Sequence, residues 1–364
     1  MLSEIGSNFW IAPEDLTGNC SLQPPYSFGY RGSDYAWLST GRSATRFVLK
    51  TIEERNPNIK KVALLPPFTC HTVIEPFIEF GYEVHTLPIS LGLETTADEI
   101  IRGQELTQAS VLIVHRYYGF DTLPGFNQVV EVLRAKGVVI IEDCTQCMYS
   151  TFKVSDADYF VGSIRKWCGV PDGGFAICKE GRLTEKPTVE DEAMVEAKRI
   201  ASALKYQFLF KHEGDKPTFK AKYREGESLL DEQHGFYSIG NISSTIQANL
   251  NIETLRRQRQ SNYQTLLNGL RNVPSFKILF NELPDEVVPL YFPIIVEDRE
   301  ALQGLLADND IYAPVVWPKP EYCPPICKGA EDVYEKILCI PIDQRYGTDD
   351  MDRIVKVITN NYEN

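Results

Sequence analysis

Short apolar runs alternate with segments of helical spacing through the first half of the chain. Six runs, each bounded by Gly, Pro or charged residues, have the composition of buried strands: residues 61–65, 83–89, 110–115, 138–143, 158–163 and 174–179. Between several of them, residues 44–55, 73–80 and 126–136 place apolar side chains on one helical face. This alternation predicts an α/β fold with a mostly parallel sheet between helices. Ligands of such sheets bind at the carboxyl ends of the strands, so the residues after each run are candidates for chemistry.

The pattern changes after about residue 180. Residues 193–210 predict an amphipathic helix, residues 211–241, with four glycines, predict a long loop, and residues 245–272 predict one helix. A smaller unit follows, with predicted strands and helices at 290–296, 299–308, 311–316 and 349–360. We therefore expect a large domain over residues 1–245, including the segment 181–245, and then an interdomain helix with a small C-terminal α/β domain over 246–364.

Composition narrows the class of protein. The 364 residues are 43% hydrophobic and 24% charged, which is ordinary for a globular protein and excludes a disordered chain. The net charge of −13 disfavours a nucleic-acid binder, whose surface is basic. No apolar run is long enough for a membrane span, and the first residues lack the pattern of a secretory signal. We expect a soluble, cytoplasmic protein that binds neither nucleic acid nor membrane.

The nine cysteines do not predict a disulfide framework, because their number is odd and their spacing irregular. Cys144 and Cys147 form a single C-x-x-C pair, which suits redox chemistry or a metal. No second pair and no histidine pair completes a zinc site, so we predict no metal and expect buried, reduced thiols.

Two charged residues stand directly after predicted strands. Asp143 ends the run VVIIED, and Lys166 follows the run DYFVGS. Alone, Asp143 is equally a helix cap or a surface acid, and Lys166 is more often a solvated charge. Together they suit pyridoxal 5′-phosphate (PLP), which needs a lysine for its Schiff base and an acid beside the pyridine nitrogen. The carboxylate keeps that nitrogen protonated, and the displaced lysine can carry a proton.

The first predicted helix opens with a candidate phosphate site. Its free backbone N–H groups and the positive end of its dipole suit a phosphate group. The hydroxyls of Thr40 and Ser43, the charge of Arg42 and the small size of Gly41 fit the same role. Such a helix start is common without any phosphate, and its value here is its place before the strand–helix series.

Several motifs stand in an order typical of one family. They are TGRSA at 40–44, PPFT at 66–69, HRYYG at 115–119, EDCTQ at 142–146, Lys166 with DGG at 172–174, and GN at 240–241 followed by QA at 247–248 and LRRQR at 255–259 with Tyr263. In order and spacing the set resembles the DegT-type (DegT/DnrJ/StrS) sugar aminotransferases, which belong to the fold type I PLP-dependent transferases. The resemblance covers about residues 30 to 355. It implies an aspartate aminotransferase-like fold.

The resemblance also implies roles for individual residues. Lys166 would form the Schiff base, Asp143 would pair with the pyridine nitrogen, and Gln146 would lie near the ring hydroxyl. Gly41 and Arg42, mainly through their backbone, and Ser163 would bind the phosphate. Asn241 would reach the phosphate in the neighbouring subunit, which implies a homodimer with shared active sites.

The sequence departs from the family pattern at several positions. Cys70, followed by His71, stands where an aromatic residue usually stacks on the cofactor ring. Either His71 stacks there or the cofactor is held more loosely, and a lone histidine is more often structural. Arg42 replaces a threonine, and Ser243 replaces an arginine. Trp317 and Arg345 are further candidates for substrate contact, although a packed surface aromatic explains Trp317 at least as well and a salt bridge is the safer explanation of Arg345.

The resemblance implies an aminotransferase that moves an amino group from L-glutamate to a keto-sugar nucleotide, as in polysaccharide biosynthesis. Dehydratases of this family have histidine in place of the lysine, so Lys166 favours transamination. Two alternatives stay open. One is a regulatory protein of this fold without turnover, and the other is a PLP lyase or decarboxylase that binds an amino acid through Arg345 or Arg31. A dinucleotide-binding module is disfavoured, because no G-x-G-x-x-G follows the first strand.

Overall fold

The chain divides into two compact units, each built from segments that are distant in sequence. A computed structural model describes residues 4–152, 154–233 and 235–362. The first unit comprises residues 1–7, 58–157 and 252–364, and the second comprises residues 8–57 and 158–251. The predicted boundary at residue 245 stays a prediction, and the extreme ends of its two domains, 1–3 and 363–364, lie outside the described residues.

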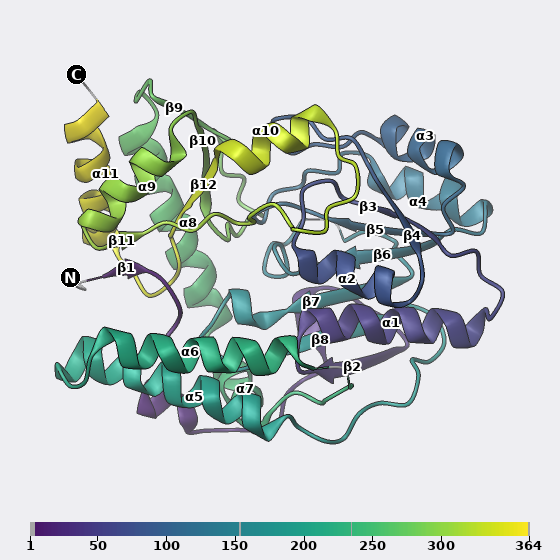
Figure 1. The fold of residues 1–364 in the computed structure, drawn as a ribbon, viewed down its shortest axis with the longest axis horizontal. Helices are drawn as coiled ribbons and strands as arrows, with labels where there is room; N and C mark the ends of the chain where they lie inside the picture. Colours follow the sequence, from purple (N-terminus) through teal and green to yellow (C-terminus); the bar gives the residue numbers. More distant parts are fainter. Residues whose placement is uncertain (1–3, 153, 234, 363–364) are drawn as a thin grey trace. The chain divides into compact units, whose positions relative to one another are not determined.

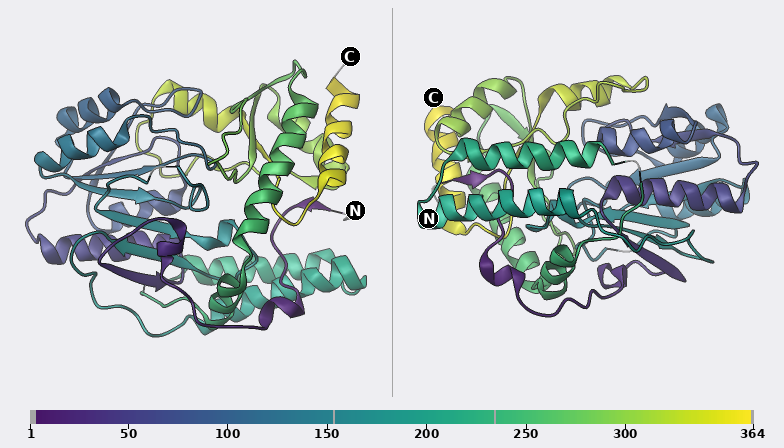
Figure 2. Two further views of the ribbon diagram at one scale, coloured as in Figure 1. Left: turned by 180° about the vertical axis from the view of Figure 1, so that it is seen from behind. Right: turned by 60° about the horizontal axis from the view of Figure 1, so that its bottom comes forward.

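Parallel strands and covering helices form the first part of the first unit. The strands β3 (Val62–Leu65), β4 (Glu83–Thr86), β5 (Val111–His115) and β6 (Val139–Asp143) are all parallel, in the order β6-β5-β3-β4. Every side chain of β3 and β5 is buried, as expected for strands covered on both faces. The connections contain α2 (His71–Glu79), α3 (Ala97–Thr107) and α4 (Phe126–Ala135), and α3 and α4 lie side by side (Figure 2). The predicted motifs at 66–69, 115–119 and 142–146 lie at the carboxyl ends of the strands β3, β5 and β6.

The C-terminal part of the first unit has its own antiparallel sheet, in the order β12-β10-β9. Its elements are α8 (Ile252–Leu270), β9 (Phe276–Ile278), β10 (Phe292–Val296), α9 (Arg299–Asp308), β11 (Ile311–Tyr312), α10 (Lys328–Lys336), β12 (Ile337–Ile340) and α11 (Thr348–Tyr362). The short strand β1 (Ile5–Gly6) pairs in parallel with β11. One apolar cluster, which includes Leu266, Phe292 and Ile354, forms the core of this part.

The second unit carries three antiparallel strands and a pair of long helices. The strands β2 (Asp34–Leu38), β7 (Tyr159–Ser163) and β8 (Gly174–Cys178) are ordered β2-β8-β7. Helix α1 (Gly41–Arg55) packs on β7 and β8, and α5 (Glu192–Tyr206) lies along α6 (Lys216–Asp231) (Figure 1). The remaining elements are the short helices η1 (Pro13–Leu16), η2 (Pro25–Phe28), η3 (Ile164–Lys166) and η4 (Gln207–Lys211), and α7 (Asn241–Asn249).

The predicted α/β class with parallel and antiparallel strands is confirmed, and all six predicted strands of the first half exist. Two predictions about the middle of the chain are wrong. The predicted loop 211–241, apart from residue 234, which lies outside the described residues, contains helix α6. Asp215 caps this helix by accepting a hydrogen bond from Thr218 N, and Pro217 stands in its first turn.

The predicted single helix 245–272 is two helices, because the chain is extended at Leu250 (φ −65°, ψ 122°). The side chain of Asn249 donates from one nitrogen to the carbonyl oxygens of Asn19 and Thr245 at 2.8 Å. The first of these bonds ties the end of α7 to a distant loop, a contact that helical spacing alone does not reveal.

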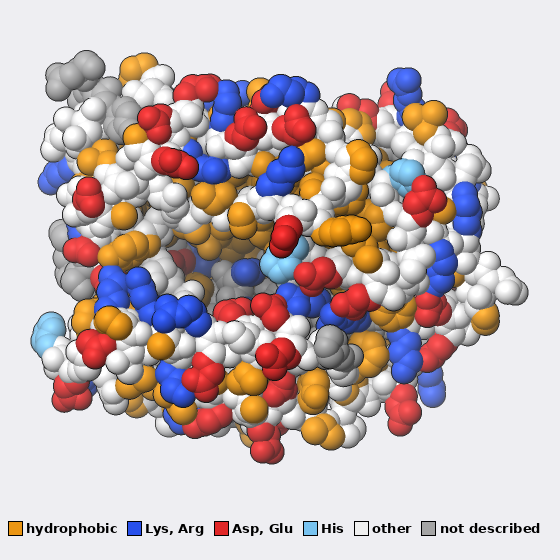
Figure 3. Space-filling model, viewed as in Figure 1, with side chains coloured by type: hydrophobic (Ala, Val, Ile, Leu, Met, Phe, Trp, Pro, Cys, Tyr) orange, Lys and Arg blue, Asp and Glu red, His pale blue; other side chains and the backbone are white. Residues whose placement is uncertain are grey.

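Charges of both signs occur on the face of the molecule that Figure 3 shows. Figure 3 shows Lys and Arg side chains interspersed with Asp and Glu over the face in view, with apolar side chains between them. Both signs therefore occur on this face despite the net charge of −13. Within the described ranges, no helix combines the length and the apolar character that crossing a membrane requires.

Candidate active site

The phosphate turn begins helix α1 in the second unit. Thr40 is its N-cap, and its hydroxyl accepts a hydrogen bond from Ser43 N at 3.0 Å. A Cβ atom on Gly41 would lie 3.2 Å from the Cβ of Ser163, at the end of β7. A side chain at position 41 would therefore crowd Ser163, and glycine leaves the backbone of the turn accessible to a ligand. The structure thus brings Thr40, Gly41, Ser43 and Ser163 together.

Arg42 belongs to this turn, and its guanidinium group pairs with a carboxylate on helix α6. Its Nη2 atom lies 2.9 Å from Asp231 Oδ1 at the end of α6, and its side chain is 8% exposed. The guanidinium group thus joins α1 to α6. The prediction that Arg42 binds a phosphate mainly through its backbone stays a prediction.

The two glycines of the DGG motif have separate structural reasons. Gly173 has φ +125°, which disfavours any other residue. A Cβ atom on Gly174 would lie 2.2 Å from the carbonyl oxygen of Thr40. The start of β8 therefore fits against the phosphate turn only if residue 174 is glycine.

Asp172 explains why serine occupies position 243. Its buried carboxylate accepts hydrogen bonds from the Ser243 hydroxyl and from Gly240 N, the latter at 2.8 Å. Burial raises the pKa of Asp172 to about 6, against the opposing effect of these two bonds. Because Ser243 is fully buried, an arginine side chain would not fit there. The arrangement anchors the start of α7, where Asn241 is exposed.

Lys166 lies at the end of the short helix η3, directly after β7, and its side chain is exposed. The predicted order of strand, turn and lysine is therefore present. The carboxylate of Glu227 lies close by, since it pairs with the neighbouring residue Arg165 at 2.9 Å.

The first unit holds the other predicted cofactor contacts. Asp143 ends β6, and its Oδ1 accepts a hydrogen bond from Thr145 N at 2.9 Å. Gln146 is 2% exposed, and its Oε1 accepts a hydrogen bond from Tyr118 N at 2.6 Å. The backbone thus fixes which way the Gln146 amide points.

His71 is the first residue of α2 and is largely exposed. Its Nε2 lies 4.0 Å from Glu75 Oε1 on the next turn, and its Nδ1 lies 3.7 Å from the Cys70 sulfur. The His71 side chain is 52% exposed, and its stacking role stays a prediction.

Aromatic rings surround His115 at the end of β5. The His115 ring meets the Tyr117 ring edge-on at 4.6 Å and the half-buried Trp317 ring at 5.3 Å. Its Nε2 donates to the Phe68 carbonyl at 3.1 Å. Burial lowers the pKa of His115 to about 4, so the ring is neutral near pH 7. Trp317 therefore packs against this cluster and keeps part of its indole exposed.

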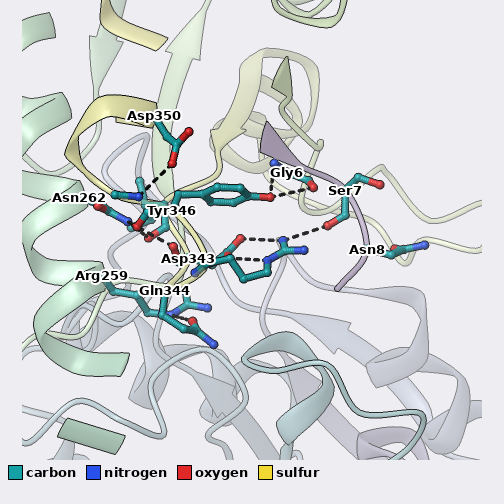
Figure 4. Close-up of polar contacts among 12 residues, drawn as sticks. Gly6, Ser7, Asn8, Arg259, Asn262, Asp343, Gln344, Tyr346 and Asp350 are labelled. Atoms are coloured by element: carbon teal, nitrogen blue, oxygen red, sulfur yellow. Dashed lines mark hydrogen bonds and ion pairs between the residues drawn. The ribbon is translucent and has the colours of Figure 1, made fainter. Parts of the chain in front are cut away.

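Arg345 belongs to a buried ion pair in the C-terminal part. Its Nε and Nη2 atoms bond both oxygens of Asp343, at 2.7 and 2.9 Å. Figure 4 shows Asp343 among the polar groups around Arg259 and Tyr346. The salt bridge is therefore confirmed as the explanation of Arg345, since two nitrogen atoms of its guanidinium group already bind the Asp343 carboxylate.

Two buried hydrogen-bond donors without a partner bear on whether these residues suit PLP. Gln146 Nε2 and Thr69 Oγ1 are buried and have no hydrogen-bond partner among the residues that the structure describes. Both follow strand ends where the sequence predicts a ligand, and unpaired buried donors there suit a polar ring substituent. In the second unit, the glycine at position 41 leaves the backbone of the turn accessible to a phosphate. The residues present fit the cofactor.

Sequence reasoning missed some of these groups. Thr69 carried the available signal, since it follows a predicted strand inside a predicted motif. Lys198 on α5 and Glu227 on α6, which pair with each other beside Arg165, belong to no motif. Within the described ranges no cluster of His, Cys, Asp and Glu could hold a metal ion, and none of the nine cysteines forms a disulfide.

Comparison with known proteins gives consistent matches. The model of the DegT/DnrJ/EryC1/StrS aminotransferase family matches residues 225–359, which include Asn241 but not Lys166. Among solved structures, Helicobacter pylori PseC, an aminotransferase involved in the biosynthesis of pseudoaminic acid, is 13% identical, with 99% of each chain covered and a TM-score of 0.72. No curated protein matches the sequence.

Two further structures share the fold. The putative sugar aminotransferase Spr1654 from Streptococcus pneumoniae, in its PMP form, is 15% identical, with 99% of this chain and 98% of that chain covered and a TM-score of 0.68. The sugar aminotransferase CalS13 from Micromonospora echinospora is 16% identical, with 92% and 90% covered and a TM-score of 0.65. The sequence of residues 225–359 is thus similar to the DegT/DnrJ/EryC1/StrS aminotransferase family, and the chain shares the fold of these solved structures along nearly all of its length.

Proposed function

We propose that this aminotransferase takes its amino group from L-glutamate, passes it to a keto-sugar nucleotide, and binds PLP through Lys166. The observation that carries the proposal lies within the second unit. The phosphate turn at Gly41 packs against Ser163, three residues before Lys166, so one short stretch of chain joins a phosphate cradle to an exposed lysine. The acceptor class rests on the sugar aminotransferases that share the fold.

Each proposed role follows from the chemistry of the side chain. When bound, PLP supplies an electron-withdrawing ring that stabilises negative charge on the substrate carbon. Lys166 Nζ holds the cofactor and then moves a proton as a general base and acid. The Asp143 carboxylate stabilises positive charge on the pyridine nitrogen. Gln146 Nε2 would donate a hydrogen bond to the ring oxygen, and His71 would cover the ring. The phosphate would be held by the residues of the phosphate turn and the end of β7: Thr40, Gly41, Arg42, Ser43 and Ser163.

The proposal includes a homodimer in which Asn241 reaches the partner's phosphate. Asn241 is exposed at the start of α7, anchored there by Asp172. The cytoplasmic location stays a prediction. The lyase alternative loses one of its two candidate arginines, because Arg345 is paired with Asp343, and Arg31 stays the other candidate.

The test is an absorbance spectrum of the purified protein with added PLP, before and after L-glutamate. We expect a yellow band that glutamate converts to the band of the amine form. Borohydride reduction and mass spectrometry should place the cofactor on Lys166, and the variant Lys166→Ala should show neither the band nor the adduct.

The other outcomes are equally informative. A band that glutamate leaves unchanged contradicts the proposed donor and favours a reaction on another amino acid. Absence of any band in the wild-type protein would favour the regulatory alternative without turnover.

A further inference from the structure

One carboxylate joins the turn that carries Lys166 to both long helices of the second unit. Glu227 Oε1, on α6, lies 2.9 Å from Arg165 Nη2 and 2.7 Å from Lys198 Nζ on α5. Arg165 is the residue before Lys166 in the helix η3. The Lys198 side chain is 4% exposed, whereas that of Glu227 is 54% exposed. Lys198 is therefore a buried cation whose carboxylate partner also holds the neighbour of Lys166.

The packing of α5 on α6 makes room for this lysine. A Cβ atom on Gly226 would lie 2.5 Å from Lys198 Cγ, so the aliphatic stem of Lys198 crosses α6 where a side chain is missing. The two helices run side by side in Figures 1 and 2. A glycine inside a helix and a buried ammonium group both cost stability, whereas an apolar contact would supply packing without either cost. This arrangement indicates a role beyond packing.

The charges of the cluster act on one another. Burial and the charge of Arg165 lower the pKa of Lys198 to about 7, with a further contribution from Lys166 and against the effect of Glu227. Burial raises the pKa of Glu227, but the charges of Arg165, Lys198 and Lys166 outweigh it and lower this pKa to about 2. Lys166 is thus within electrostatic range of both groups, and changes in their charge act on its nitrogen.

We propose that Lys198 and Glu227 are positioning residues for Lys166: Glu227 fixes the turn through Arg165, and the pair sets the electrostatic field at the Lys166 nitrogen. The inference rests on the proposed function, in which Lys166 holds the cofactor. In this role the pair orients the lysine and controls its readiness to exchange a proton, and it does not itself contact the substrate.

The experiment compares Glu227→Gln, Lys198→Met and Glu196→Gln in the full-length, PLP-loaded protein. Glu196→Gln is the matched control, because it breaks an exposed ion pair with Arg199 on the same helix α5. The main readout is the pH midpoint at which the absorbance of the lysine-linked cofactor changes, measured beside kcat and KM. Thermal unfolding of each variant reports its stability separately.

Loss of the Glu227 charge favours the neutral lysine-derived nitrogen, so the midpoint should fall by about half a pH unit or more. Loss of Lys198 should move the midpoint in the opposite direction. Both variants should lower kcat more than they raise KM, Glu227→Asp should recover part of each effect, and the control should match the wild type.

Midpoints equal to that of the control in both variants, with the cofactor still bound, overturn the inference even if unfolding temperatures fall. If Lys198→Met does not fold, Glu227→Gln and Glu227→Asp decide the question, because the Glu227 side chain is half-exposed. A wild-type protein without the lysine-linked band instead overturns the proposed function, and this inference with it.

Discussion

Individual buried side chains account for two positions at which this sequence departs from the pattern of the family that it resembles. Ser243 stands in place of arginine because its hydroxyl donates to the buried Asp172. Arg42 stands in place of threonine and pairs with Asp231, while Thr40 supplies the hydroxyl that caps the helix. At both positions the side chain that departs from the pattern makes a polar contact of its own.

His115 should make stability depend on pH in a defined direction. Its pKa is about 4 in the folded protein and about 6.5 when unfolded, so between these values the unfolded chain binds more protons. The contribution of His115 to stability is therefore complete above about pH 6.5 and is lost as the pH falls through 4. Between pH 7 and pH 5 it should decrease by about 2 kcal/mol.

Denaturant unfolding of the wild type and of His115→Gln at these two pH values checks this expectation. The difference in unfolding free energy between the two proteins should shrink by that amount at pH 5. The neutral amide cannot gain a proton, so an unchanged difference would contradict the proposed origin of the effect.

At the scale of the element, replacing glycine with alanine should have opposite effects on stability in two helices. Gly226 lies where Lys198 crosses α6, whereas a Cβ atom on Gly304, in α9, would meet no atom within 4 Å. We expect Gly226→Ala to destabilise the protein by about 1–2 kcal/mol, because overpacking outweighs the better helix propensity of alanine.

Gly304→Ala is the matched control and should stabilise the protein by about 0.5–1 kcal/mol. Chemical denaturation measures both changes. Similar effects in the two variants would show that Gly226 is not required for close helix packing.

The same glycine shows what sequence pattern can and cannot predict. Strands such as β5 and β6 were predictable, since their apolar runs are short, continuous and bounded by polar residues. Helix α6 was missed because Gly226 resembles a loop signal until its neighbour Lys198 is known. Helix α3 carried a usable signal, a capping box between Thr96 and Glu99, that the apolar pattern did not reveal.

The candidate site shows the same limit. Lys166, Asp143 and the phosphate turn were predictable because each directly follows or precedes a strand in a recognisable order. Lys198 and Glu227 were not predictable, since their pairing depends on how α5 packs on α6. The break between α7 and α8 likewise depends on the contact of Asn249 with a segment 230 residues earlier.

At the scale of the whole molecule, a tyrosine ties the start of the chain to its C-terminal part. The Tyr346 hydroxyl accepts a hydrogen bond from Gly6 N at 2.8 Å and donates to the Gly6 carbonyl at 3.1 Å (Figure 4). Tyr346→Phe would leave the buried Gly6 N–H without this acceptor, at a cost of about 1–3 kcal/mol.

Denaturant unfolding should report this loss, and hydrogen exchange at Gly6 should become faster. Tyr322→Phe is a suitable control, because Tyr322 is 79% exposed. A Tyr346→Phe protein as stable as this control would show that the contact contributes little.

The pairing of Ile5 with Ile311 has a consequence for how the protein is made. A ribosome synthesises β1 some 300 residues before its partner strand β11. Likewise, residues 58–157 must wait for residues 252–364 before the first unit is complete. The nascent chain therefore carries unpaired strand edges and uncovered apolar surface through most of its translation, which makes it a natural client for chaperones that shield growing polypeptides.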